Sequence, residues 1–159
     1  MNMITDPALA AFESLMRLRE GCETTVYLDT LDHATVGIGH LVIPADNLKV
    51  GDTIPQTRVN ALFAVDGAAA LQAARAQMAV AGITSEAFVP YLASVCFQLG
   101  VRWTKGFPAT WKLICEGEYW DAAFYLDESE WEDETPVRVK DFQDALRALP
   151  ASPEPEVVA

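Results

Sequence analysis

Residues 20–40 read EGCETTVYLDTLDHATVGIGH, and this stretch decides the fold of the N-terminal part of the chain. Apolar and polar residues alternate from Val26 to Asp29, the alternation stops over residues 30–33, and it resumes from Thr35 to Ile38. Alternation of this kind is typical of a strand with one buried face. The stretch therefore predicts two antiparallel strands joined by a turn.

A helix is expected just before this hairpin. Apolar and charged residues mix at helical spacing over residues 7–19, and Gly21 is the residue type that most often follows the last turn of a helix. Glu20 should then lie at the end of the helix, with Gly21 as its C-cap. A carboxylate at that end is directed toward the hairpin, which carries a second carboxylate, Asp29.

The rest of the chain predicts a mainly helical α+β protein with one domain over residues 1–149. A small antiparallel sheet belongs to a lobe at about 7–54, a connecting helix covers about 55–80, and a helical lobe covers about 83–149. The proline-rich, acidic residues 150–159 are expected to be disordered. Five aromatic residues are expected in the core of the helical lobe: Trp103, Phe107, Trp111, Trp120 and Trp131.

Three blocks of sequence resemble the bacteriophage lysozymes of the T-even type. Glu-Gly, Tyr-x-Asp and Thr-Val-Gly-x-Gly-His lie within residues 20–40, VCFQLG at 95–100 is followed by Gly106-Phe107, and SEWEDETPVR occupies 129–138. The resemblance implies a lysozyme-like fold and a muramidase that cuts the β-1,4 bond between N-acetylmuramic acid and N-acetylglucosamine in bacterial peptidoglycan. It also implies inversion, with Glu20 as the acid and with Thr35 helping Asp29 to hold the attacking water.

The chemistry of glycoside hydrolysis agrees with these roles. It needs one carboxylic acid to protonate the leaving oxygen and one carboxylate on the other side of the sugar. Taken singly, Glu20, Asp29 and Thr35 read as a helix-end glutamate, a turn aspartate and an ordinary strand residue. Only their joint spacing, together with the two later blocks, favours the catalytic interpretation.

The resemblance assigns further residues to the site. Thr135-Pro136 is typical of a helix start, so Arg138 should lie on the first turn of a late helix, where the family's arginine pairs with the catalytic glutamate. Asp32 departs from the family, which usually has glycine at the hairpin tip, and Tyr125 stands where asparagine is usual. The residues expected to contact the saccharide are Leu41, Phe97, Gln98, Thr110 and Tyr125.

His40 has three possible roles: catalytic base, metal ligand or structural residue. Asp66 falls on the apolar face of the connecting helix, where a carboxylate needs a partner. We expect a structural His40–Asp66 ion pair, as in the family. Two alternatives remain for these residues: a metal held by Asp29, Asp32, His33 and His40, and a Cys22 thiol that acts with His40. The spacing of the possible metal ligands matches no known pattern, so no metal or other cofactor is expected.

The chain carries a net charge of −12, whereas an enzyme that adsorbs to an anionic wall is often basic. Part of the charge forms an acidic run, which is interpreted as a solvated face rather than an ion site or a patch for a basic partner. The run consists of Asp127, Glu128, Glu130, Glu132, Asp133 and Glu134.

Several expectations concern location and partners. The three cysteines lack close spacing and fit a reducing compartment, and the N-terminus lacks the features of a signal peptide. We expect an endolysin that stays in the host cytoplasm until a holin releases it, a monomer with peptidoglycan as its partner, no nucleic acid and no stable membrane insertion. The alternative is a lysozyme-fold module with weak catalysis that binds the wall or belongs to the virion.

Overall fold

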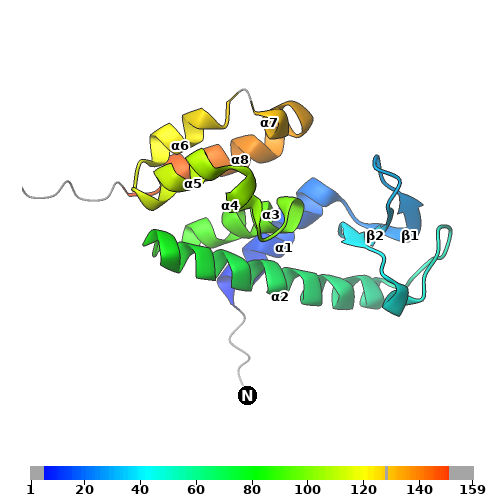
Figure 1. The fold of residues 1–159 in the computed structure, drawn as a ribbon. Helices are drawn as coiled ribbons and strands as arrows, with labels where there is room; N and C mark the ends of the chain where they lie inside the picture. The colour runs from blue at the N-terminus through cyan, green and yellow to red at the C-terminus, as the bar shows by residue number, and fades with distance from the viewer. Residues whose placement is uncertain (1–5, 128, 151–159) are drawn as a thin grey trace, which may run out of the picture.

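The computed structural model describes residues 6–127 and 129–150 of the 159-residue chain. It confirms a mainly helical α+β architecture, with the sheet at one end of the long helix α2 and most other helices at the other end (Figure 1). The prediction for residues 151–159 lies outside the described residues. The elements, in chain order, are α1 (Pro7–Glu20), β1 (Glu23–Leu28), β2 (Ala34–Gly37), β3 (His40–Leu41), the 3-10 helix η1 (Pro44–Asp46), α2 (Gln56–Ala81), the 3-10 helix η2 (Glu86–Phe88), α3 (Val89–Leu99), α4 (Trp103–Gly106), α5 (Pro108–Cys115), α6 (Tyr119–Tyr125), α7 (Glu130–Glu134) and α8 (Pro136–Arg147).

Helix α1 has local signals at both ends. The carboxylate of Asp6 accepts a hydrogen bond from the backbone N–H of Ala8 at 3.0 Å, which caps the N-terminus. At the other end Gly21 has φ of 71°, a left-handed value that glycine adopts at little cost. The helix therefore stops at Glu20, one residue beyond the predicted range and at the position the C-cap predicts.

The sheet is antiparallel in the order β1-β2-β3. Thr35 pairs with Tyr27 on one side and Leu41 on the other, whereas Val36 pairs with His40. Residues that pair across strands share a face, and successive residues alternate between faces. Thr35 and Leu41 therefore lie on one face, and Val36 and His40 lie on the other.

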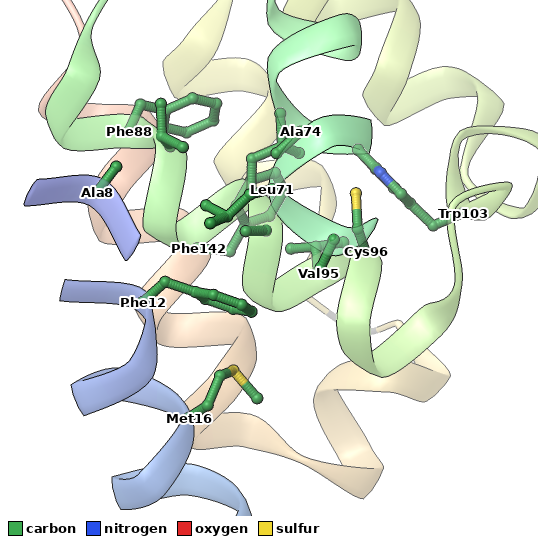
Figure 2. Packing of buried hydrophobic residues seen from close by; sticks show 14 of the residues in the cluster. Ala8, Phe12, Met16, Leu71, Ala74, Phe88, Val95, Cys96, Trp103 and Phe142 are labelled. Carbon is green, nitrogen blue, oxygen red and sulfur yellow. The ribbon is translucent and has the colours of Figure 1, made fainter. Parts of the chain in front are cut away.

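The hydrophobic core joins α1, α2, α3 and α8 in one cluster (Figure 2). Phe12 and Met16 of α1 have no exposed surface, and Phe142 of α8 is 1% exposed. The rings of Phe12 and Phe63 lie 5.6 Å apart, so α1 packs directly on α2. This packing fixes the C-terminal end of α1, and Glu20 with it.

Helix α2 follows the predicted pattern closely. It starts at Gln56, after Pro55, and ends at Ala81, within one residue of the expected 55–80 range. The apolar face of α2 buries Val59, Phe63, Ala70 and Ala74, and Leu62 beside them is partly buried. No helix within the described ranges is both long and apolar enough to cross a bilayer.

The prediction that Trp120 belongs to the core is wrong, since 67% of its surface is exposed. Helix α6 buries Tyr119, Ala122 and Ala123, which share one helical face, so residue 120 is turned away from that face. The ring lies instead 5.6 Å from the guanidinium of Arg147, a cation–π contact. The other four aromatic residues are in or against the core: Trp103, Phe107, Trp111 and Trp131.

Candidate active site

Glu20 lies at the last residue of α1 with about a quarter of its side chain exposed (25%). Its Oε1 accepts a charge-assisted hydrogen bond from Nη1 of Arg138. Its Oε2 faces the β2–β3 turn, because a Cβ placed on Gly39 would lie 3.1 Å from this atom. The two carboxylate oxygens therefore have different surroundings.

Arg138 lies on the first turn of α8, after Pro136, as the sequence predicts. Only 8% of its side chain is exposed, and a buried guanidinium needs acceptors for its N–H groups. Nη2 donates to the hydroxyl of Ser94 at 3.0 Å and to its carbonyl at 3.2 Å. The expected contact between Arg138 and Glu20 is thus present, and Ser94 of α3 joins it.

Asp29 lies in the turn that closes the hairpin. Its Oδ1 accepts hydrogen bonds from the backbone N–H groups of Leu31 and His33, both at 2.8 Å. Asp32 adopts φ of 61°, so aspartate takes here the left-handed conformation that glycine takes more readily. The N–H of His33, opposed by burial and helped by the N–H of Leu31, lowers the pKa of Asp29. This carboxylate stays ionised at neutral pH.

Thr35 is buried, with 4% of its surface exposed, and its hydroxyl donates to the carbonyl of His33 at 3.1 Å. Strand alternation places Thr35 on the same face as Tyr27. Burial is the largest cause that raises the pKa of Tyr27, and the charges of Glu20, Glu23 and Asp29 raise it further. Both candidate carboxylates therefore act on one phenol, on the face of the sheet that carries Thr35.

His40 lies on the opposite face and holds three elements together. Its Nδ1 is 2.6 Å from Asp66 of α2, and its Nε2 is 2.8 Å from Asp46 of η1. Burial lowers the pKa of His40, but hydrogen bonds to Asp46 and Asp66 outweigh burial and raise it overall. With a carboxylate at each nitrogen, the imidazolium form donates both bonds. The expected His40–Asp66 contact is present.

The other groupings considered for His40 are not assembled. His33 lies 3.6 Å from Asp29 at the hairpin, whereas His40 is engaged with Asp46 and Asp66. Within residues 6–127 and 129–150, no group of three or more His, Cys, Asp or Glu side chains is arranged so that it could hold a metal ion. The thiol of Cys22 lies 3.9 Å from the amide of Gln56. Neither a metal site nor a Cys22–His40 pair is formed by these contacts.

The five residues expected to contact saccharide lie in three different settings. Leu41 and Phe97 line a groove of 350 Å³ beside α2, and Phe97 also packs on Phe12 in the core. Thr110 and Tyr125 line a larger hollow of 640 Å³ on the helical lobe. Gln98 is used internally: its amide donates to Thr135 and accepts from the indole of Trp131, each at 3.0 Å.

Sequence reasoning missed three participants in this region. Asp46 completes the His40 cluster, Ser94 binds Arg138, and Arg19 binds Asp141 with two bonds of 2.7 and 2.9 Å. Each partner is distant along the chain or lies in a loop without periodicity.

A model of the family described as phage lysozyme matches residues 17–140 of this chain. The matched range contains Glu20, Asp29, Thr35 and Arg138 and covers more than half of the sequence. It begins within α1, contains the sheet and all of α2, and ends within α8. The chain therefore belongs to the phage lysozyme family, and it is a glycoside hydrolase, a muramidase that acts on bacterial peptidoglycan.

Proposed function

We propose that the protein is an endolysin that cuts the β-1,4 bond between N-acetylmuramic acid and N-acetylglucosamine with inversion at the anomeric carbon. The observation that carries the proposal is the unequal setting of two carboxylates. Glu20 is held at a helix end between Arg138 and Gly39. Asp29 is kept ionised by backbone N–H groups of the turn. Glycoside hydrolysis requires two carboxyl groups in different roles, and the different settings of Glu20 and Asp29 support that division.

In this mechanism Glu20 gives its proton to the glycosidic oxygen, and the bond from that oxygen to C1 breaks with its electron pair going to the oxygen. A water held by Asp29 and Thr35 attacks C1 from the opposite face, and Asp29 takes the proton that the water loses. Proton exchange with solvent restores both groups. Inverting enzymes separate the two carboxyl groups by roughly 6.5–9.5 Å to admit that water.

The substrate contacts form part of the same proposal. The groove that Leu41 and Phe97 line is largely apolar, and an apolar wall suits the faces of a sugar ring. Tyr125 is 61% exposed at the rim of the larger hollow, where a phenol ring can stack on a saccharide. Thr110 supplies a hydroxyl to the same hollow. Both the nitrogen and the oxygen of the Gln98 amide form hydrogen bonds within the protein. We therefore propose that Gln98 supports α7 and does not itself bind the sugar.

Replacing Glu20 by glutamine tests the assignment of the acid. The variant keeps the shape of the side chain and removes the proton donor, so we expect the rate of new reducing ends from Gram-negative peptidoglycan to fall by about a hundredfold or more. Glu13→Gln is the matched control on the same helix, since Glu13 pairs only with Arg17 at the surface. It should keep the wild-type rate.

Equal rates for wild type and Glu20→Gln would eliminate Glu20 as the acid and favour the wall-binding or virion-associated module. The stereochemistry is tested separately by NMR of the first product formed. An α-anomer supports inversion, and a β-anomer would exclude it without affecting the assignment of Glu20.

The biological part of the proposal is release by a holin, from host cytoplasm to the wall, as a monomer. It is supported by the resemblance of this chain to the phage lysozymes. Expression in a bacterial host should leave cells intact until a holin gene is induced, and turbidity should then fall quickly. Lysis at the same rate without the holin would contradict this route.

A further inference from the structure

We propose that Ser94 is a positioning residue that keeps Arg138 on one oxygen of Glu20 and so leaves the other oxygen, Oε2, to protonate the glycosidic bond. The inference rests on the proposed function, in which Glu20 is the acid. The Ser94 hydroxyl is buried on α3 and reaches Glu20 only through Arg138.

The first step concerns the geometry of the guanidinium. This group is planar and rigid, and its two terminal nitrogens often bind both oxygens of one carboxylate in a fork. Here only Nη1 binds Glu20, whereas Nη2 is directed to the hydroxyl and the carbonyl of Ser94 and lies 3.8 Å from the sulfur of Met16. Ser94 therefore occupies the nitrogen that would complete the fork.

The second step concerns burial. Ser94 is 7% exposed, and Arg138 is 8% exposed. Nε of Arg138 is fully enclosed and has no hydrogen-bond partner within the described residues, so the guanidinium is already short of acceptors. A guanidinium that loses the Ser94 hydroxyl gains most by turning its free N–H toward the nearest anion. That anion is Glu20.

The third step concerns the oxygen that remains. Oε2 lies against Gly39, where the absence of a Cβ leaves space beside the carboxyl group. With Arg138 confined to Oε1, this oxygen can carry the proton and pass it to the glycosidic oxygen as the bond to C1 breaks. With Arg138 forked across both oxygens, the carboxylate form is held more firmly and the proton has no free position.

The test compares Ser94→Ala, which removes the hydroxyl, with Ser94→Thr, which keeps it. For Ser94→Ala we expect kcat to fall about tenfold with KM unchanged, and the basic limb of the pH profile of kcat/KM to move to lower pH. Ser94→Thr should stay within about twofold of wild type in kcat and keep its pH profile. Ser94→Cys, which offers only a weak acceptor, should behave like Ser94→Ala and serves if the alanine variant does not fold.

Val95→Ala is the control for general loss of packing, because Val95 is 2% exposed on the same helix and makes no hydrogen bond to Arg138. It should lower stability and leave the pH profile in place. A wild-type kcat and pH profile in Ser94→Ala, or an equal loss in Ser94→Ala and Val95→Ala without a shift of the profile, would overturn the role of Ser94. An active Glu20→Gln variant would instead overturn the proposed function, so the two failures are distinguishable.

Discussion

At the scale of single residues, the site depends on a close approach between Glu20 and the backbone of the β2–β3 turn. Gly39 has φ of 64°, and a Cβ there would lie 3.1 Å from the carboxyl group of Glu20. Real Cβ atoms rarely come that close, so the carboxyl group would have to move. Gly39 is thus required for two separate reasons, its backbone conformation and the space it leaves.

Replacing Gly39 by alanine should therefore reduce both stability and activity. The left-handed backbone costs roughly 1 kcal/mol of unfolding free energy, and displacement of Glu20 lowers kcat by about tenfold or more. Gly82→Ala is the matched control, because its φ is 72° and nothing lies within 4 Å of a Cβ there. It should lose similar stability, measured by urea unfolding, and keep kcat. An unchanged kcat in Gly39→Ala would show that Glu20 tolerates the displacement.

At the scale of secondary-structure elements, His40 connects β3, η1 and α2. His40 is a buried cation whose charge is neutralised by Asp46 on one side and Asp66 on the other. Removing the cation leaves two facing carboxylates, and this is more costly than losing one surface pair. The contact lies on the face of the sheet away from Thr35, although His40 and Asp66 also line the groove of Leu41 and Phe97. We therefore expect the cluster to act on stability and not on the chemical step.

His40→Asn should therefore reduce the unfolding free energy by about 3 kcal/mol while kcat stays within about twofold of wild type. The pH dependence follows from the raised pKa of His40. Its stabilisation is complete below its ordinary value of 6.5 and is lost as pH rises through the raised value of the folded state. Urea unfolding of the wild type should show stability that declines as pH rises above 6.5, and His40→Asn should lack that part of the slope.

Loss of turnover in a folded His40→Asn variant would contradict the structural role and restore the catalytic one.

A second pair of contacts acts at the same scale between α1 and α8. Arg19 binds Asp141, and Glu20 binds Arg138, with opposite polarity. Both pairs therefore join α8 to α1.

At the scale of the whole molecule, the net charge of −12 opposes adsorption to an anionic wall. Repulsion between exposed charges weakens as the Debye length falls from about 30 Å at 0.01 M to about 8 Å at 0.15 M salt. Lysis of permeabilised Gram-negative cells should accordingly rise over that range. Hydrolysis of an uncharged soluble oligosaccharide should not, which separates adsorption from chemistry. A steady fall in lysis with salt would show that repulsion does not limit the enzyme.

The sequence by itself determined α1, the β1–β2 hairpin, α2 and the start of α8, because each of these depends on local chemistry. It indicated a helical lobe after α2 but not the separate helices of that lobe, nor the third strand of the sheet. The alternation around Val26, the C-cap at Gly21 and the Thr135-Pro136 helix start all predicted structure within one or two residues. The resemblance of three blocks to phage lysozymes also predicted the pairing of Glu20 with Arg138 and of His40 with Asp66. The short motifs that carry the resemblance were therefore sufficient to indicate these contacts.

Only the tertiary structure decided what surrounds those pairs. Ser94 and Asp141 become partners through packing of helices that are far apart in sequence, and Asp46 through the short segment that follows β3. No periodicity specifies such neighbours. Trp120 illustrates the same dependence on packing. Its large aromatic side chain favours burial, but it does not lie on the face of α6 that packs against the core. Local interactions select helices and strands, whereas burial and hydrogen-bond partners depend on how their faces meet in three dimensions.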